Sequence, residues 1–219
     1  MTAHYIVPPC RETITELYRD KHIIVINKPA GLLSVPGKPP NDKDSALGRL
    51  QRIDPETRVV HRLDMSTSGL MVFGVGAGSH RHLSRQFQDR KVRKGYVAEV
   101  WNTPGVPKGE IDLPLRCDWP NRPRQMVDHV LGKSSQTLYT VIENHRTLHS
   151  RIWLEPITGR SHQLRVHMAE LGHPILGCEF YAHPEAKAAA DRLHLHASML
   201  CFQHPVSEQN LTFNSSAPF

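Results

Sequence analysis

Apolar and polar residues follow one another along the chain in the short periods typical of strands linked by tight turns. Continuous or alternating apolar runs predict strands at residues 23–26, 59–60, 70–73, 95–101, 136–144, 149–156, 193–205 and 210–213. Polar turns separate most of these runs, which favours hairpins over long crossover connections. The pattern therefore predicts an α+β protein, a single domain with a central mixed, largely antiparallel β-sheet flanked by helices and loops.

Helical spacing occurs in four segments between these runs, at residues 45–53, 79–94, 161–171 and 185–193. The clearest is the third, in which Leu164, Met168 and Leu171 fall at positions i, i+4 and i+7. Gly172 follows directly and suits the C-terminal cap of this helix. Residues 35–44 are rich in proline, glycine and lysine, so a loop is expected there.

Length and composition place the chain among ordinary globular proteins. Its 219 residues suffice for one substantial core or at most two closely packed subdomains. No apolar run approaches the ~20 residues that a membrane-spanning helix needs, and the N-terminus lacks the layout of a secretory signal. The 4 cysteines lie far apart without a CxxC pair, so we expect reduced thiols in a cytoplasmic protein.

The charge balance is basic, with a formal net charge of +6 and a pI near 9.3. Such a balance favours a polyanionic partner, with nucleic acid as the first expectation and an anionic membrane as the second. Positive charge gathers in the helical segment 79–94 and in a proline-broken loop that also contains Trp119. The residues expected to contact an RNA backbone there are Arg81, Arg85, Arg90, Lys91, Arg93, Arg116, Arg122 and Arg124.

One stretch, VVHRLDMSTSGLMVFG at residues 59–74, places a single carboxylate, Asp64, between two predicted strands. A turn aspartate that caps backbone N–H groups is the ordinary role of such a residue. Arg165 offers an alternative, because it flanks the apolar stripe of helix 161–171 and can project from the core edge into a cleft. An arginine beside a carboxylate keeps it ionised. An ionised, poorly solvated carboxylate can act as a nucleophile or as an electrostatic partner at a sugar-like C1′ carbon.

Three other motifs give weaker signals. GVGAG at residues 74–78 follows a strand and precedes a helix, but it lacks the full GxGxxG spacing of a dinucleotide site. His162, His167, His194 and His196 match neither HExxH nor a Cys/His zinc pattern, so we predict no metal site. The chain also lacks the GxSxG elbow that a serine nucleophile requires.

Six short blocks of sequence stand in a fixed order along the chain. In that order they are KPAG, HRLDMSTSG, KGY, GRSHQLRVH, HPILG and LHLHA. They resemble the blocks of the RluA-type pseudouridine synthases, and HRLDMSTSG matches the HRLDxxTSG signature of that family. The resemblance extends from about residue 22 to the C-terminus. It departs from the family pattern at Cys178, where aspartate is usual, and this departure affects only a local loop contact.

The resemblance implies a domain organisation and a reaction. Residues 22–219 would form the pseudouridine synthase catalytic domain with an active-site cleft across the sheet, and residues 1–21 an N-terminal extension packing on it, with no S4 domain. The reaction would be isomerisation of uridine to pseudouridine in RNA, without a metal or an organic cofactor. The block CDWPNRPRQ, residues 117–125, resembles the family member that acts on 23S rRNA and tRNA, so stem-loops of both RNAs are expected substrates.

The resemblance also implies roles for individual residues. Asp64 would attack C1′ or stabilise charge there, Tyr96 would stack on the flipped base and help to remove the C5 proton, and Arg165 would pair with Asp64. Arg62 would fill the gap left by the extruded base. The other expected substrate-binding residues are His61, Lys94, Arg160, Leu195 and His196. Flipping a base costs a few kcal/mol of unstacking, so phosphate contacts from the basic segments would hold the RNA meanwhile.

Two functions compete with catalysis by this set. A non-catalytic RNA-binding or folding module on the same scaffold predicts that Asp64 is dispensable. A metal-dependent hydrolase predicts inhibition by chelators, and the missing ligand spacing argues against it. The presence of Asp64, Tyr96 and Arg165 together favours the enzyme. We expect a monomer with RNA as its partner, without an obligate protein partner or an association with membranes.

Overall fold

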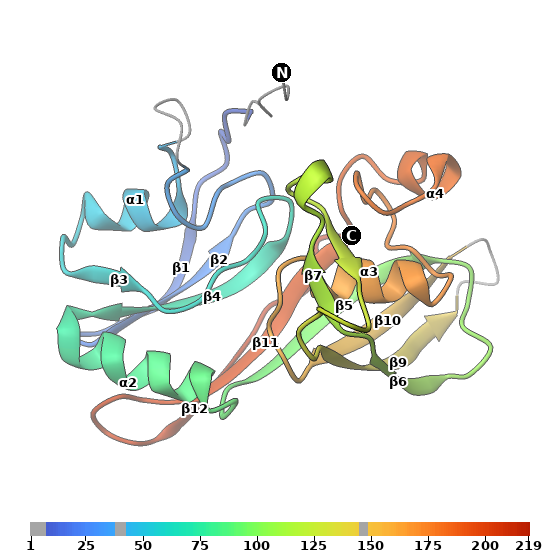
Figure 1. Cartoon of the computed structure of the whole chain (residues 1–219). Helices are drawn as coiled ribbons and strands as arrows, with labels where there is room; N and C mark the ends of the chain where they lie inside the picture. Colours follow the sequence, from blue (N-terminus) through green and yellow to red (C-terminus); the bar gives the residue numbers. More distant parts are fainter. Residues whose placement is uncertain (1–7, 38–42, 145–148) are drawn as a thin grey trace. The chain divides into compact units, whose positions relative to one another are not determined.

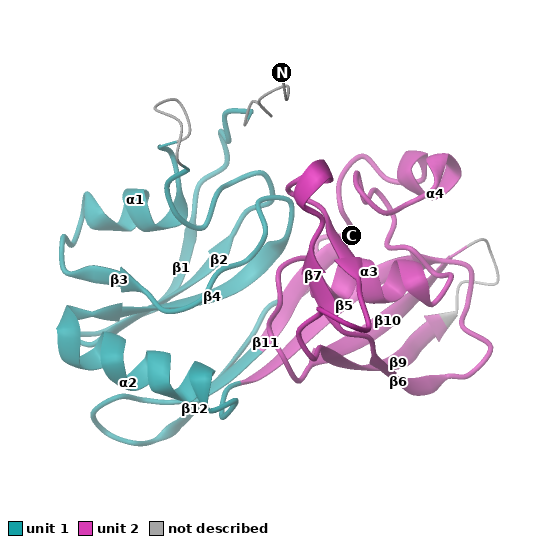
Figure 2. Cartoon of the chain, viewed as in Figure 1, with its two compact units in different colours: residues 1–92, 200–215 teal, residues 93–199, 216–219 magenta. Residues whose placement is uncertain are grey.

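The structure is a computed structural model that describes residues 8–37, 43–144 and 149–219 (Figure 1). It divides into two compact units, with unit 1 made of residues 1–92 and 200–215 and unit 2 of residues 93–199 and 216–219 (Figure 2). Parts of the expected loop 35–44 and of the expected extension 1–21 lie outside the described residues. Within the described part of the chain, no helix is long and apolar enough to span a membrane.

Unit 1 is built on antiparallel strands, two of which are buried along almost their whole length. The strands lie in the order β1 (Thr15–Arg19), β2 (Ile23–Lys28), β4 (Ser68–Val75), and β3 (Thr57–Val59) also pairs with β4. Helices α1 (Ala46–Gln51) and α2 (Gly76–Gln88) pack on β3, and α2 also packs on β4. Because Val25 lies opposite Val72 in the register, their side chains meet in the core with Leu83 of α2.

One strand is shared by the two units. In β11 (Leu195–Gln203), residues 195–199 belong to unit 2 and residues 200–203 to unit 1. Leu200 and Phe202 accordingly join the core of unit 1, whereas Leu195 joins the core of unit 2. The last strand, β12 (Asn210–Asn214), pairs with β11.

Unit 2 contains a second set of antiparallel strands and a short hairpin. The strands β5 (Arg93–Trp101), β10 (His149–Pro156), β9 (Gln136–Asn144) and β6 (Lys108–Asp112) are paired in that order. The hairpin consists of β7 (Leu115–Cys117), the 3₁₀ helix η1 (Trp119–Asn121) and β8 (Gln125–Val127). Two helices complete the unit, α3 (Gln163–Glu170) and α4 (Pro184–Ala188).

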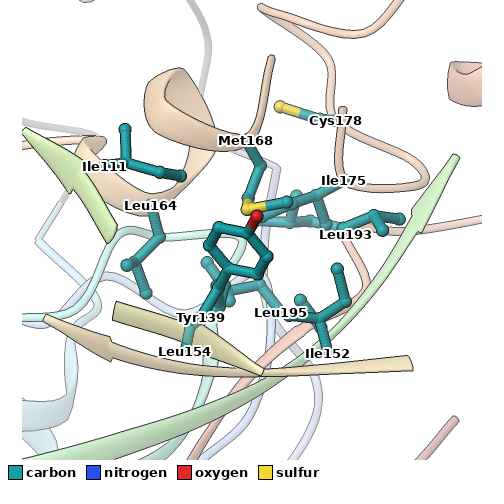
Figure 3. Close-up of a cluster of buried hydrophobic side chains, with 12 residues drawn as sticks. Ile111, Tyr139, Ile152, Leu154, Leu164, Met168, Ile175, Cys178, Leu193 and Leu195 are labelled. Carbon is teal, nitrogen blue, oxygen red and sulfur yellow. The ribbon is translucent and has the colours of Figure 1, made fainter. Parts of the chain in front are cut away.

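The core of unit 2 forms where α3 lies on the sheet. Figure 3 shows Leu164 and Met168 of α3 with their side chains directed toward Tyr139 and Leu154 of the sheet. Cys178 is also fully buried and belongs to this cluster. The prediction of an α+β protein with a largely antiparallel sheet is therefore confirmed, while the cleft across the sheet stays a prediction.

The predicted helix 79–94 is wrong at its C-terminal end, because α2 ends at Gln88 and β5 begins at Arg93. Arg90 adopts a left-handed conformation with φ 57°. The Arg90 and Lys91 N–H groups donate to the carbonyls of Phe87 and Gln86, at 3.2 and 2.9 Å. This is a Schellman motif, normally marked by glycine, and here an arginine takes the glycine position. The basic residues of the segment are consequently split between a helix, a turn and a strand.

The predicted helix 185–193 is also too long, since α4 covers only Pro184–Ala188. Its alanines favour a helix, but the chain must extend beyond Arg192 to bury Leu193 in the core of unit 2. The N–H of His194 donates to the carbonyl of Leu176 at 3.0 Å, which fixes that extended path. By contrast, α3 ends as predicted, with Gly172 at φ 86° as its C-terminal cap.

Candidate active site

The loop between β3 and β4 carries the candidate nucleophile. Asp64 is half-buried there, and its carbonyl accepts a hydrogen bond from the N–H of Thr67 at 3.1 Å. The carbonyl of Asp64 therefore takes part in a turn, while capping of backbone N–H groups by its carboxylate stays a prediction. The turn uses the main chain of Asp64, so it is compatible with either role of the carboxylate.

The backbone on both sides of Asp64 is fixed by residues from the segment after β2. On one side, the hydroxyl of Ser34 accepts from the N–H of Leu63 at 3.0 Å and donates to the Leu63 carbonyl at 2.7 Å. On the other side, the Met65 carbonyl accepts from the N–H of Gly31 at 2.8 Å. Leu63 is buried, so the flanking hydrogen bonds are shielded from water. The carboxylate is thus mounted on a backbone with little freedom to move.

A fully buried ammonium group completes this support. Lys28 donates through Nζ to the carbonyls of Pro29 and Leu32, at 2.8 Å each, and to that of Met65 at 3.2 Å. Three carbonyls match the three donors of an ammonium group. Sequence reasoning missed Lys28 and Ser34 as supporting residues. A signal for Lys28 existed, because a lysine that ends a buried apolar strand needs a specific partner.

We expect Lys28→Met to lower the free energy of unfolding by about 2 kcal/mol, because three buried carbonyls lose a charged donor while the packing volume is largely kept. Urea unfolding measures this change. The matched control is Lys21→Met, since Lys21 is an exposed lysine of the same unit. Equal stability of the Lys28→Met variant and the wild type would contradict a supporting role for the ammonium group.

The two residues at the start of the signature have different environments. His61 accepts from the N–H of Val72 through Nε2 at 3.1 Å and stacks on Phe87, with ring centroids 4.5 Å apart. Its ring therefore ties the loop to β4 and α2 whether or not it also binds substrate. Arg62 is exposed, which suits the expected insertion into RNA but does not test it.

The basic residues of unit 1 that were expected to contact an RNA backbone are solvent-exposed. Arg81 and Arg85 lie one turn apart on α2, and Arg90 and Lys91 follow in the Schellman turn. Arg93, the next basic residue, is exposed at the start of β5 in unit 2. These residues have the exposure that phosphate contacts require.

Tyr96 lies on β5 in unit 2, half-buried against the core of that unit and opposite Leu154 in the register. The residue before it, Gly95, permits a close approach, because a Cβ there would lie 1.9 Å from the ring of Trp153. Lys94 reaches the carbonyl of Thr158 with Nζ at 3.5 Å. The strand start that carries Tyr96 is therefore packed closely against its surroundings.

Arg165 is 97% buried in unit 2, with 3% of its surface exposed, so the expected position at a core edge is wrong. Its Nε donates to Sγ of Cys178 at 3.4 Å. Its guanidinium carbon lies 5.2 Å from the ring centroid of Phe180 and 5.4 Å from that of Tyr181. The departure from the family pattern at Cys178 therefore lies in direct contact with Arg165, the candidate catalytic arginine.

The remaining expected substrate-binding residues also lie in unit 2. Arg160 is exposed and donates through Nε to the carbonyl of Ser134 at 3.2 Å. Leu195 and His196 are buried, with 3% and 1% of their surfaces exposed. Burial, with the nearby positive charge of Arg192, lowers the pKa of His196 to about 4. His196 is therefore neutral at pH 7 and adds no positive charge for RNA.

The other histidines of the sequence analysis have structural partners. His167 lies 2.9 Å from the hydroxyl of Thr137, and burial lowers its pKa. His194 lies 2.8 Å from the carboxylate of Glu99. Among the described residues, no three histidine, cysteine, aspartate or glutamate side chains are grouped as metal ligands.

The hairpin arginines Arg116 and Arg122 differ in whether they form an ion pair with a carboxylate. Arg116 is paired with Asp128, whose pKa falls to about 2 because the N–H of Leu131, Arg116 and the N–H of Val130 all donate to it. Arg122 lies over the ring of Trp119, 4.7 Å from its centroid, and both are exposed. Of these two arginines, Arg122 has the freer charge for an RNA phosphate.

The expected catalytic residues are distributed over both units. Asp64 belongs to unit 1, whereas Tyr96 and Arg165 belong to unit 2. The pairing of Asp64 with Arg165 and the stacking of Tyr96 on a base stay predictions. The structure describes the support of Asp64 within unit 1 and the burial of Arg165 within unit 2, each by itself.

Comparison with known proteins identifies the family. Residues 22–170 match the family model described as RNA pseudouridylate synthase. The dual-specificity RNA pseudouridine synthase RluA of Escherichia coli strain K12 is 53% identical over 212 residues, which are 97% of each chain. That of Yersinia pestis is 55% identical over 203 residues, which are 93% of this chain and 98% of the relative. The solved structure of human RNA Pseudouridylate Synthase Domain Containing 1 is 26% identical with a TM-score of 0.80, covering 98% of this chain and 87% of that one. The chain belongs to the RNA pseudouridylate synthase family.

Proposed function

We propose that this protein isomerises specific uridines of 23S rRNA and tRNA to pseudouridine. The observation that carries the proposal is Asp64, held in the HRLDMSTSG loop by hydrogen bonds to the residues before and after it. Family membership makes the chain an isomerase, and the relatives named dual-specificity synthases support two classes of RNA as substrates. RNA is accordingly the partner, and a monomer in the cytoplasm stays a prediction.

The reaction rearranges one nucleotide without changing its composition. The N1–C1′ bond breaks, the uracil turns, and a C5–C1′ bond forms, while the C5 proton leaves and N1 gains one. In this proposal the Asp64 carboxylate attacks C1′ or stabilises the positive charge that develops there. Stacking of Tyr96 on the flipped base and pairing of Arg165 with Asp64 belong to the same proposal. No step in it requires a metal or an organic cofactor.

A fixed carboxylate suits this chemistry. Attack at C1′ demands a defined approach to the sugar, and a nucleophile on a mobile loop would pay for its ordering in each turnover. Ser34, Gly31 and Lys28 remove that cost by anchoring Leu63 and Met65 before substrate arrives. The carboxylate can then be positioned by a few side-chain rotations alone.

In this proposal the exposed basic residues bind the phosphates of the RNA. They include Arg62 of the signature loop, Arg81 and Arg85 of α2, and Arg122 of the hairpin. Base flipping costs a few kcal/mol, so phosphate contacts are needed to hold the strand while one base leaves the stack. Exposed basic side chains serve this purpose, because contacts to phosphate hold the RNA without reading its sequence.

Release of tritium from RNA labelled with [5-³H]uridine tests the proposed function, because the C5 hydrogen is lost only when C5 joins C1′. We expect the wild-type protein to release tritium from both tRNA and 23S rRNA fragments in the presence of EDTA. Release from one RNA alone would restrict the substrate class, and inhibition by EDTA would favour metal-dependent chemistry. RNA binding without release would favour the non-catalytic module.

We expect RNA affinity to fall with salt by a log–log slope of roughly −0.7 per phosphate contact to single strands. In the double variant Arg81→Gln, Arg85→Gln the magnitude of this slope should drop by about 1.4, since two contacts are lost. Filter binding at several salt concentrations measures the slope. Lys108→Gln, an exposed change on β6, should leave it unchanged. An unaltered slope in the double variant would remove α2 from the RNA-binding surface.

A further inference from the structure

The hydroxyl group of Tyr181 joins three segments of unit 2. It accepts from the N–H of Gln125 in the hairpin at 2.8 Å. The same oxygen lies 2.6 Å from Nδ1 of His162, the residue that precedes α3 and adopts a left-handed φ of 54°. One side chain therefore links the hairpin, the start of α3 and the segment 178–181 that follows the HPILG block.

The ring of Tyr181 lies against two arginines, Arg165 of α3 and Arg124 of the hairpin. The guanidinium carbon of Arg165 lies 5.4 Å from its centroid, and that of Arg124 lies 5.7 Å away. Arg165 is buried, so its direction is set by what surrounds it, and its surroundings include Cys178 and the rings of Phe180 and Tyr181. The rings of Phe180 and Tyr181 are half-buried and lie against the buried Arg165 guanidinium, so a shift of the Tyr181 ring changes the packing around that guanidinium.

The hairpin has a second connection to the same segment. Arg124 donates to the carbonyl of Phe180, and β8 also packs against α3. The outer part of the hairpin presents Trp119, which is 64% exposed, with Arg122 over its ring. An aromatic ring and a guanidinium at an exposed site provide stacking and charge for an unpaired RNA segment. The part of the hairpin that presents Trp119 and Arg122 is thus followed directly by Arg124 and Gln125, which contact Phe180 and Tyr181.

We infer that Tyr181 is a positioning residue that couples RNA bound on the hairpin to the orientation of Arg165. RNA that orders the β7–η1–β8 hairpin also orders segment 178–181 through the Gln125–Tyr181 hydrogen bond and the Arg124 contacts. The contacts that Phe180 and Tyr181 make with the Arg165 guanidinium are then held more firmly. This inference rests on the proposed function, since it gives the RNA on the hairpin an effect on the reaction.

The test uses Tyr181→Phe, which removes the hydroxyl and keeps the ring over Arg165. In single-turnover reactions at saturating RNA, we expect the rate constant for tritium release to fall about 5- to 10-fold, with less than about a 2-fold change in RNA affinity. Arg124→Gln should reduce the same rate constant, and the double variant should lose less than the product of both effects. Tyr18→Phe removes an exposed hydroxyl bonded to Asp20 in unit 1 and should leave the rate unchanged. Fully multiplicative effects would overturn the coupling.

A second readout does not depend on turnover. Amide hydrogen exchange with and without RNA should show protection of residues 115–127 and 176–182 in the wild type. In Tyr181→Phe, RNA should still protect the hairpin but should protect segment 176–182 less than in the wild type, because only the Arg124 contacts remain. Equal protection of segment 176–182 in the variant and the wild type, or protection of neither segment in the wild type, would overturn the inference. Coupled protection in a protein that releases no tritium would support the inference and refute the proposed function instead.

Discussion

Replacing Asp64 with asparagine is expected to lower the rate of tritium release at least about 10³-fold, because removal of a nucleophile typically costs that much or more. Asparagine keeps the size of the side chain and removes only its charge. The turn should survive, since the N–H of Thr67 donates to the main-chain carbonyl of residue 64. Single-turnover release from labelled tRNA, with RNA affinity measured in parallel, separates lost chemistry from lost binding.

The matched control for this change is Asp191→Asn, which neutralises an exposed aspartate of unit 2. It should release tritium at the wild-type rate. Equal release by Asp64→Asn and the wild type would move the nucleophile elsewhere and revive the non-catalytic role of Asp64 as a turn residue. Loss of RNA binding together with activity would show that Asp64 supports the fold of the loop instead of the reaction.

The strands with an apolar run or an alternation of their own were predictable, because burial on the sheet imposes a period that local sequence records, whereas β1, β6, β7 and β8 were missed. The run at 23–26 is apolar at every position, and β2 buries both faces of that stretch. Segment 95–101 alternates and lies in β5, with Ala98 and Val100 in the core. The structure of such a segment follows from the pattern of its own residues, so composition and period are enough to predict it as a strand.

Helix ends were less predictable because they depend on distant contacts. Nothing local in the sequence of Arg90 marks a left-handed residue, since arginine is not a common choice for a Schellman position. The early end of α4 follows from the burial of Leu193 and from the bond between His194 and Leu176, which lie in another segment. Tertiary packing overrides helix propensity at both places.

The candidate site also has features that the sequence predicted and features that it did not. Asp64 was singled out as the one acid in a polar insert, but physical chemistry alone favoured a turn, and the signature resemblance supplied its role. The support by Lys28 and Ser34 could not be read from spacing, because these residues lie 37 and 29 positions before the loop residues that they hold. The burial of Arg165 was missed because the helical pattern suggested one apolar stripe, whereas α3 is buried on almost every side.

Segment 178–181, which follows the HPILG block, contacts the candidate catalytic residue Arg165. It supplies three neighbours of Arg165, two of them aromatic. Its path depends on the sharp turn at Gly177, where φ is 68°. A defect at that turn should therefore disturb both the stability of unit 2 and the direction of the arginine.

We expect Gly177→Ala to lower the free energy of unfolding by about 4 kcal/mol, from a strained left-handed alanine and a steric clash together. A Cβ on Gly177 would lie 1.8 Å from the carbonyl oxygen of Arg192. That oxygen belongs to backbone whose path is fixed by the bond from His194 to Leu176, so it cannot move aside at low cost. Urea unfolding measures the loss, and tritium release should fall with it because Cys178 is the next residue.

Gly105→Ala, where a Cβ meets no atom within 4 Å, should change stability by less than about 0.5 kcal/mol. Equal stability of Gly177→Ala and Gly105→Ala would show that the backbone near Arg192 yields easily, and that segment 178–181 does not depend on this turn.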